Sequence, residues 1–510
     1  MTVRGRQEKA MKGRLKCILA AAALFCAPLA WSQNSLPYSP PSAWSDQQQN
    51  GSTDQSQGDQ SQDDQSQGDQ SQSGSGDQSQ SGAGGPQATF SHPEELPPLN
   101  LFGDVLSHTG VSFNTSLGIT GLNQTGYNGQ QAYWYASYLA TAGVNIVQIR
   151  PTLMWSLGYS GGVDTITGIG PFTYSALNQN AHANITWDFA KRWQFRVKDT
   201  YMYSDDPFAP FFSYLGNPTP NNPNPVVYFA NSVIEQNQGT ADLTYRLGEH
   251  DTLDFFGGES FFRFLRGYGS QGYLPNLGSL WNSVTYSGGG FYQHDFSARW
   301  SVGGGYTFTA MDFGHGQSRA GVNMLQTFAS YRISKTMSVS GWVGPEFTNS
   351  KDLIPLLCFP SGCLIETQHN SYFNMAEGAT FRWQAPRGNT FGAQYSHSVA
   401  NGGGLFGTVR SYQVTATYSR PINRNWRLGI GFYYLNDTSL TPQLGNTFLR
   451  GEQATIGFTR QLNDAWKLQG YYAYAHQVQN YGTFFGLPTN LDTSALGLTV
   501  SYVWNHSMGR

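Results

Sequence analysis

The residues best suited to catalysis in this sequence are a histidine, a serine and an asparagine in the segment YSHSVANGGG. These are His397, Ser398 and Asn401. A serine nucleophile needs a base within hydrogen-bond reach and a third group that orients that base. Because His397 and Ser398 are adjacent, they point to opposite faces of an extended strand. The segment therefore does not predict a hydrolase, and we interpret the chain as a protein that is not an enzyme.

Cysteine chemistry is restricted to two pairs. Cys17 and Cys26 lie in the N-terminal segment, whereas Cys358 and Cys363 flank the turn-forming sequence FPSG. Two nearby cysteines in an exported protein predict one disulfide, Cys358–Cys363. A zinc site is the alternative, but two thiols without a third ligand bind zinc poorly. No zinc motif, phosphate-binding loop or dinucleotide fingerprint is found, so we predict no cofactor and no metal.

The N-terminus has the order of features of a secretory signal. Its basic residues are Arg4, Arg6, Lys9, Lys12, Arg14 and Lys16. They precede the apolar run Cys17–Ala27, and Ala30-Trp31-Ser32 fits a small-x-small cleavage site. A lipoprotein anchored at Cys26 is the alternative, although Phe25 and the residues before it do not fit the expected small residue. We predict a signal peptide over residues 1–32.

Cleavage would change the charge of the chain. Of 29 basic and 32 acidic residues, 23 and 31 would remain, which gives a net charge near −8. This balance argues against nucleic acid as a partner. The next segment, residues 33–99, is rich in Gln, Ser, Gly and Asp and repeats a degenerate GDQSQ unit. Such a segment buries too little apolar area to offset its chain entropy, which predicts a disordered periplasmic linker.

Residues 100–510 show the alternation of β-strands. Only 12% of the chain is charged and 15% is aromatic, whereas a soluble domain has about 25% charged residues. No second apolar run approaches the roughly 20 residues of a membrane-spanning helix. Apolar side chains instead recur at every second position, as in Trp426, Leu428, Ile430, Phe432 and Tyr434.

Three features separate a membrane barrel from a soluble sandwich. Trp193, Trp300, Trp426 and Trp466 each follow a short turn, as expected of an aromatic girdle at a lipid–water boundary. Short turns alternate with longer connections, which we expect at residues 158–179, 204–226, 266–281, 345–371 and 436–446. The chain also nearly ends on a strand, in which Leu496, Leu498, Val500, Tyr502 and Trp504 share one face.

This last strand resembles the C-terminal signal of bacterial outer-membrane proteins, which the barrel-assembly machinery reads. Gly497, Val500 and Tyr502 match its core. Over residues 100–510 the pattern as a whole resembles porin-like outer-membrane barrels. The resemblance implies an all-β fold, a transmembrane antiparallel β-barrel of about 16–18 strands preceded by a disordered arm. It also implies the bacterial outer membrane as location, with its lipids and the assembly machinery as partners.

The candidate functional residues line the inside of such a barrel. They alternate with the aromatic positions and are Gln194, Arg196, Lys198, Ser301, Thr307, Thr309, Ser338, Ser340, Arg427 and Lys467. Arg196 and Lys198 are candidates for a basic strip that selects anions; the alternative is an ordinary wet wall. The acids Glu346, Asp352, Glu366 and Glu377 lie in or beside the disulfide loop, which either folds inward as a constriction or is a stiffened surface loop.

Barrel size decides the predicted function. Sixteen to 18 strands leave an aqueous passage unless a loop fills it. The sequence therefore predicts a channel for passive diffusion of small hydrophilic solutes, with a homo-oligomer left open. The alternatives are an exopolysaccharide export barrel, in which Tyr433 and Tyr471 stack on sugars, and a surface adhesion or structural barrel with a closed lumen.

Overall fold

The computed structural model describes residues 109–124, 133–168, 173–204, 233–266, 282–314, 318–359, 362–385, 388–402, 407–440, 447–480 and 490–507. These residues form strands β1 (Gly110–Gln124), β2 (Tyr133–Arg150), β3 (Leu153–Gly168), β4 (Thr173–Ala190), β5 (Trp193–Ser204), β6 (Val233–Arg246), β7 (Asp251–Arg266), β8 (Ser283–Asp295), β9 (Trp300–Phe313), β10 (Ser318–Ser334), β11 (Met337–Phe359), β12 (Gly362–Gln384), β13 (Thr390–Asn401), β14 (Thr408–Pro421), β15 (Trp426–Ser439), β16 (Phe448–Gln461), β17 (Trp466–Asn480) and β18 (Asn490–Ser507). The described part of the chain contains no helix long and apolar enough to cross a membrane.

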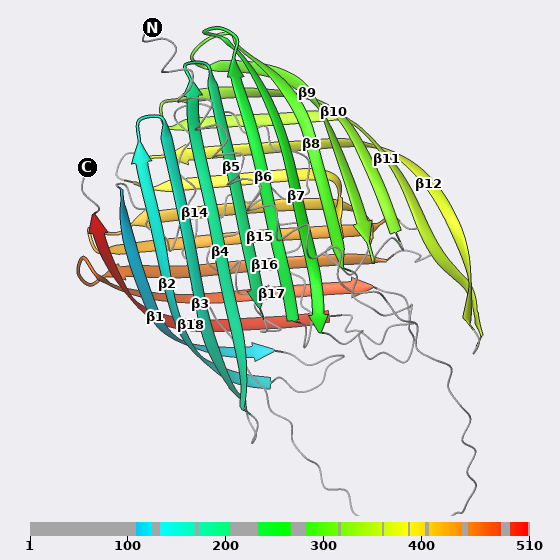
Figure 1. Cartoon of the computed structure of the whole chain (residues 1–510). Helices are drawn as coiled ribbons and strands as arrows, with labels where there is room; N and C mark the ends of the chain where they lie inside the picture. Colours follow the sequence, from blue (N-terminus) through cyan, green and yellow to red (C-terminus); the bar gives the residue numbers. More distant parts are fainter. Residues whose placement is uncertain are drawn as a thin grey trace, which may run out of the picture. The chain divides into compact units, whose positions relative to one another are not determined.

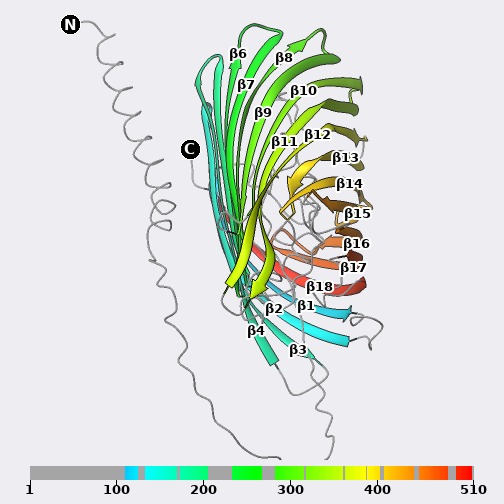
Figure 2. The same ribbon diagram turned by 90° about the vertical axis from the view of Figure 1, so that its right-hand side faces the viewer.

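The strands close into a ring. Each strand pairs antiparallel with the next, and β18 pairs with β1 from Gly110–Ser507 to Gln124–Thr493. Closing a sheet requires its strands to tilt against the barrel axis. The tilt is plain in Figure 1, where β2–β8 cross the β14–β18 wall behind them, and Figure 2 shows the two walls from the side. The predicted antiparallel barrel is confirmed, with 18 strands.

The short turns at one end of the barrel share a side-chain hydrogen bond. A polar residue accepts a hydrogen bond from the backbone N–H of the tryptophan three positions later, which opens the next strand. The pairs are Asn423–Trp426 at 3.0 Å, Asn463–Trp466 at 2.9 Å and Ser297–Trp300 at 3.2 Å. Such Asx and Ser turns mimic a backbone turn. They fix where each strand restarts, and therefore the register of the tryptophans.

Two predicted long connections are wrong. Residues 158–179 and 345–371 lie mostly in strands β3–β4 and β11–β12. Their glycines suggested loops, but a glycine also makes room within a wall: a Cβ at Gly158 would lie 2.1 Å from the ring of His182 on the neighbouring strand. The turn between β2 and β3 falls at Pro151, which cannot donate to the ladder.

The wall is discontinuous between β12 and β13. These strands pair only from Gln384–Thr390 to Glu377–His397, whereas β11 and β12 pair almost along their full 23 residues. Figure 1 shows this β11–β12 hairpin curving beyond the ends of the neighbouring strands. We call the region past Glu377 and His397 the seam. The loop end of the barrel is the end opposite the tryptophan turns.

Candidate functional site: the barrel interior

Each strand has an apolar face and a more polar face, and the apolar faces form the outside of the ring. On β15, Ile430 and Phe432 are exposed, whereas the alternate residues Tyr433 and Leu435 are buried. On β18, Leu496 is 65% exposed. Inner-face polar groups bond to one another, as between the hydroxyls of Ser116 and Thr141 at 2.6 Å. This distribution suits a barrel with an apolar environment outside.

The outer apolar band has a measurable height. It begins at Trp466 and ends ten positions along β17 at His476, whose ring contacts Asp492 at 2.7 Å. A similar polar pair, Arg450 and Glu452 at 2.5 Å, lies on β16. Ten residues span about 33 Å along a strand, or about 23–27 Å along the axis at the tilt of membrane barrels, whose apolar band is about 25 Å tall.

The outer face also carries a polar patch on β5–β7. There Asn237 donates to Asp199 at 2.8 Å, Tyr201 donates to Glu235 at 3.3 Å, and Arg263 lies 3.6 Å from Glu235. Exposed carboxylates at this height are unfavourable against lipid. The patch is a candidate for a contact between subunits, and a homo-oligomer stays a prediction.

All ten predicted lumen residues lie on the inner face. They belong to β5, β9, β11, β15 and β17, at the alternate positions to the exposed apolar side chains. Arg196 donates to Gln194 at 2.8 Å, and Gln194 donates to Asp188 at the same distance. Lys198 lies opposite Asn184 on β4. Their contribution to ion selectivity stays a prediction.

The predicted tryptophan girdle lies at one end of the barrel. Trp193, Trp300, Trp426 and Trp466 are the first residues of their strands, and Trp504 lies near the end of β18. Several stack on an aromatic ring of a neighbouring strand, as Trp193 does on Tyr245 with ring centres 4.2 Å apart. Their place at a membrane boundary stays a prediction.

Charge is unevenly distributed along the inner face. The inner-face bases Arg196, Lys198, Arg332, Arg382, Arg427 and Lys467 lie in the half of the wall near the tryptophan turns. The buried charged groups near the loop end are carboxylates: Asp164, Glu346, Asp352 and Asp437. Asp164 accepts from Ser137 at 2.7 Å and Asp352 from Ser318 at 2.5 Å. The half near the tryptophan turns carries charges of both signs, because Asp242 lies opposite Arg196 and Asp254 opposite Thr244 on the same face, whereas the buried charges described near the loop end are acidic.

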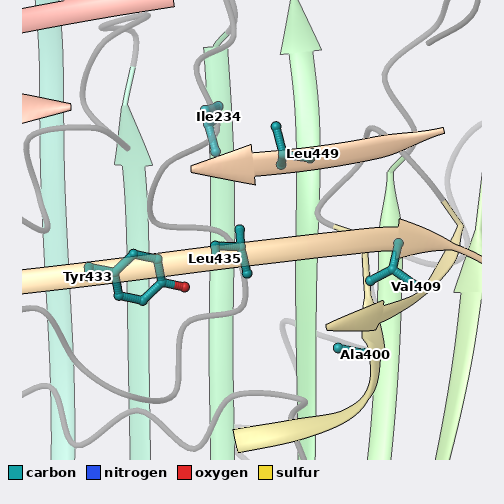
Figure 3. Packing of buried hydrophobic residues seen from close by; sticks show 6 residues of the cluster. All are labelled: Ile234, Ala400, Val409, Tyr433, Leu435 and Leu449. Atoms are coloured by element: carbon teal, nitrogen blue, oxygen red, sulfur yellow. The ribbon is translucent and has the colours of Figure 1, made fainter. Parts of the chain in front are cut away.

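Opposite walls touch at the loop end. Ile234 of β6 packs in one buried cluster with Tyr433 and Leu435 of β15, although eight strands separate β6 from β15 on either side of the ring. Figure 3 shows these residues, with Ala400, Val409 and Leu449, between strands that cross steeply. Among the described residues, this cluster joins two opposite walls across the lumen at its loop end.

The end of β13 also lies between these opposite walls. Val399 packs in a second cluster with Met311 and Phe313 of β9. Asn401 donates to Ser283 at 2.9 Å and to Thr285 at 3.3 Å, both on β8. These contacts join β13 to strands that are not its neighbours in the ring.

The three residues considered for hydrolysis are used structurally here. His397 stacks on Tyr412 of β14, with ring centres 4.0 Å apart and planes 5° apart. Ser398 projects from the opposite face of β13, and Asn401 binds β8. The three side chains do not converge on one point.

The acids expected in a loop lie on strands instead. Glu346 and Asp352 are buried on the inner face of β11, whereas Glu377 lies on the outer face of β12 and accepts from Tyr395 at 2.8 Å. Glu366 is exposed on the β11–β12 hairpin. The expected loop is therefore wrong, because the segment is a paired hairpin; a constriction formed by this segment stays a prediction.

Several predictions lie outside the described residues. The signal peptide and the linker fall in residues 1–108, so the domain boundaries stay predictions. The backbones of Cys358 and Cys363 are directly paired in the β11–β12 register, but their side chains lie outside the described part. The disulfide also stays a prediction.

Sequence reasoning missed the residues that join opposite walls across the lumen. In the β15 segment FYYLND, consecutive apolar residues Phe432–Leu435 interrupt the alternation. A strand that is apolar on both faces is buried on both faces. This signal was available for Tyr433 and Leu435, whereas Ile234 and Ala400 carry no comparable local signal.

The fold and the interior define a class: closed antiparallel β-barrels with an apolar outer face and a polar inner face. No family model and no curated protein sequence matches the chain. Among solved structures, the chain is similar to OpdQ of Pseudomonas aeruginosa, with 14% identity, a TM-score of 0.38 and coverage of 78% of this chain and 99% of that one. OccK2 of the same organism, in complex with glucuronate, shows 11% identity, a TM-score of 0.37 and coverage of 78% and 98%.

A third similar structure is the ferric-catecholate import receptor Fiu of E. coli. It shows 8% identity, a TM-score of 0.42 and coverage of 78% of this chain and 82% of that chain. At these identities and TM-scores, none of the three similarities assigns a function to this chain.

Proposed function

We propose that this chain is a channel of the bacterial outer membrane through which small hydrophilic solutes diffuse passively. The carrying observation is the closed ring of 18 antiparallel strands with apolar side chains outside and polar ones inside. A ring this large leaves an aqueous space in its interior. The apolar band fits the outer membrane, into which the barrel-assembly machinery inserts such proteins.

The first test is conductance. Purified protein, folded in detergent and added to a planar lipid bilayer, is expected to give discrete current steps in KCl. Protein kept in urea is the control and should leave the bilayer intact. A sealed bilayer with folded protein present, under any applied voltage, would contradict the proposal. That result would favour a structural or adhesion barrel. The contact between opposite walls supports this alternative, because such a barrel needs no open lumen.

Polysaccharide export has weaker support. Tyr471 lies on the inner face and shares a 3.1 Å hydrogen bond with Thr120. Tyr433, the other candidate platform for a sugar ring, is 2% exposed and packed into the closing cluster. A sugar has no access to this ring in the described conformation. The smaller solutes of a diffusion channel are therefore favoured.

The basic strip predicts a change in ion selectivity. The double substitution Arg196→Gln, Lys198→Gln removes two positive charges from the inner wall and is expected to lower the permeability ratio of chloride to potassium roughly two- to threefold. The reversal potential in a KCl gradient measures this ratio. Arg319→Gln removes a charge from the outer face, where Arg319 binds Asp312 at 2.8 Å, and should leave the ratio unchanged. If the double variant and Arg319→Gln gave equal reversal potentials, Arg196 and Lys198 would not contribute to ion selectivity.

A further inference from the structure

The loop end of β13 has an unusual environment for a strand in a barrel wall. From His397 to Asn401 every residue is buried, on both faces of the strand. Val399 packs on β9 and β10, whereas Ala400 packs on β6 and β14–β16. The strand is therefore enclosed between two walls, and its end lies within the lumen.

The seam is what allows this position. Past Glu377 and His397, β12 continues along β11 without pairing to β13, so the two strands diverge. Glu346, on the inner face of β11, spans the gap: its carboxylate accepts from the backbone N–H of Val399 at 3.0 Å and from Asn374 at 3.1 Å. A buried carboxylate thus takes the place of the missing backbone ladder.

Among the described residues, polar contacts tie the displaced wall to β8 and to β12. Asn401 bonds to Ser283 and Thr285 of β8, and Tyr372 of β12 donates to the carbonyl of Leu440 past β15. Apolar packing of Val399 and Ala400 adds to these contacts. In contrast, the pairings of β13 with β14, β14 with β15 and β15 with β16 are continuous. The pairing of β16 with β17 is equally continuous, so the sheet is free only along the loop end of β13, where it can bend.

We propose that the loop ends of β13–β16 are a gate that is shut in this conformation and opens by moving away from β6–β10, with its hinge where the β12–β13 pairing ends. The inference rests on the proposed channel function, because a gate acts on a conduction path. Opening separates Asn401 from β8 and breaks the hydrogen bond between Val399 and Glu346. The Glu346 carboxylate then becomes accessible from the lumen. The remaining β12–β13 pairs and the continuous β16–β17 pairing keep the barrel closed as a ring.

A disulfide across the gate tests the proposal. The double substitution Ser283→Cys, Asn401→Cys, made with Cys358→Ser and Cys363→Ser, joins β8 to β13 where the two side chains are 2.9 Å apart. In bilayers, oxidation is expected to reduce the open fraction at least tenfold, and dithiothreitol should restore it. The matched control is Asn349→Cys, Ser371→Cys, which joins directly paired residues on the outer face of β11 and β12, whose side chains are 2.8 Å apart, and should leave the current unchanged.

A second pair of variants tests the hydrogen bond between the Glu346 carboxylate and the backbone N–H of Val399. Glu346→Ala is expected to raise the open fraction severalfold, whereas Glu249→Ala, in the exposed turn between β6 and β7 at the other end of the barrel, should not change it. A heat-modifiable gel shift shows that each variant is folded.

The outcomes separate the two proposals. If reduced and oxidised S283C/N401C carry the same current, and E346A behaves as wild type, the gate is refuted while the channel stands. If the folded wild-type protein conducts under no condition, the channel function fails and the gate fails with it.

Discussion

Arginine in place of Ile185 is expected to destabilise the folded barrel by about 2–4 kcal/mol, the cost of a cation near the middle of the lipid-facing surface. Ile185 projects outward from β4, five residues from the turn, and is 38% exposed. Its neighbours on the same face are Trp155 and Val197. Neither offers the guanidinium a counter-charge. The free energy of unfolding is measured by reversible urea titration in phospholipid vesicles, with tryptophan fluorescence as the signal.

The matched control is arginine at Asn184, the preceding residue. Asn184 lies at the same height but on the inner face, where it donates to Ser156 at 3.2 Å. A cation there faces the polar interior and, directly opposite, Lys198; with this repulsion included, we expect a loss of about 1 kcal/mol or less. Equal losses for the two variants, or a larger loss at Asn184, would reverse the assignment of inner and outer faces, and the channel proposal would then lose its basis.

The strand pattern was largely predictable because it is local. Alternation along β15 and β17, and a tryptophan after each Asn or Ser turn, are properties of a few consecutive residues. A closed ring of paired strands follows because, in a membrane, every backbone N–H and C=O group of a strand must be hydrogen-bonded to a neighbouring strand. The errors arose where composition misled: the glycines of β3 suggested a loop, but they lie in the wall.

The contact between opposite walls was not predictable in the same way. It depends on Ile234 meeting Leu435 across the ring, and on β13 leaving β12 after Glu377. Neither event has a signature in neighbouring residues, since both depend on how two distant walls approach. Glu346 illustrates the difficulty: its acidity suggested a constriction, whereas its actual partner is the backbone of Val399 on a strand two places along the ring.

Leu435→Ala is expected to have the largest combined effect of any single truncation in the lumen. Leu435 is fully buried in the cluster between opposite walls, so removing its side chain costs about 2–5 kcal/mol through lost burial and the cavity that remains. Because this packing is broken when the gate opens, the loss falls on the shut conformation. We therefore expect a lower free energy of unfolding and, in bilayers, a higher open fraction.

Ser340→Ala is the control for this variant. Ser340 lies on the inner face of β11, outside both closing clusters, and its truncation should change stability by about 0.5 kcal/mol or less and leave the current as it is. In Leu435→Ala, the free energy of unfolding should fall and the open fraction should rise together, because both depend on the same packing contact. A destabilised variant with an unchanged open fraction would mean that the cluster is a permanent plug, and a solute would then have to cross the barrel by another path.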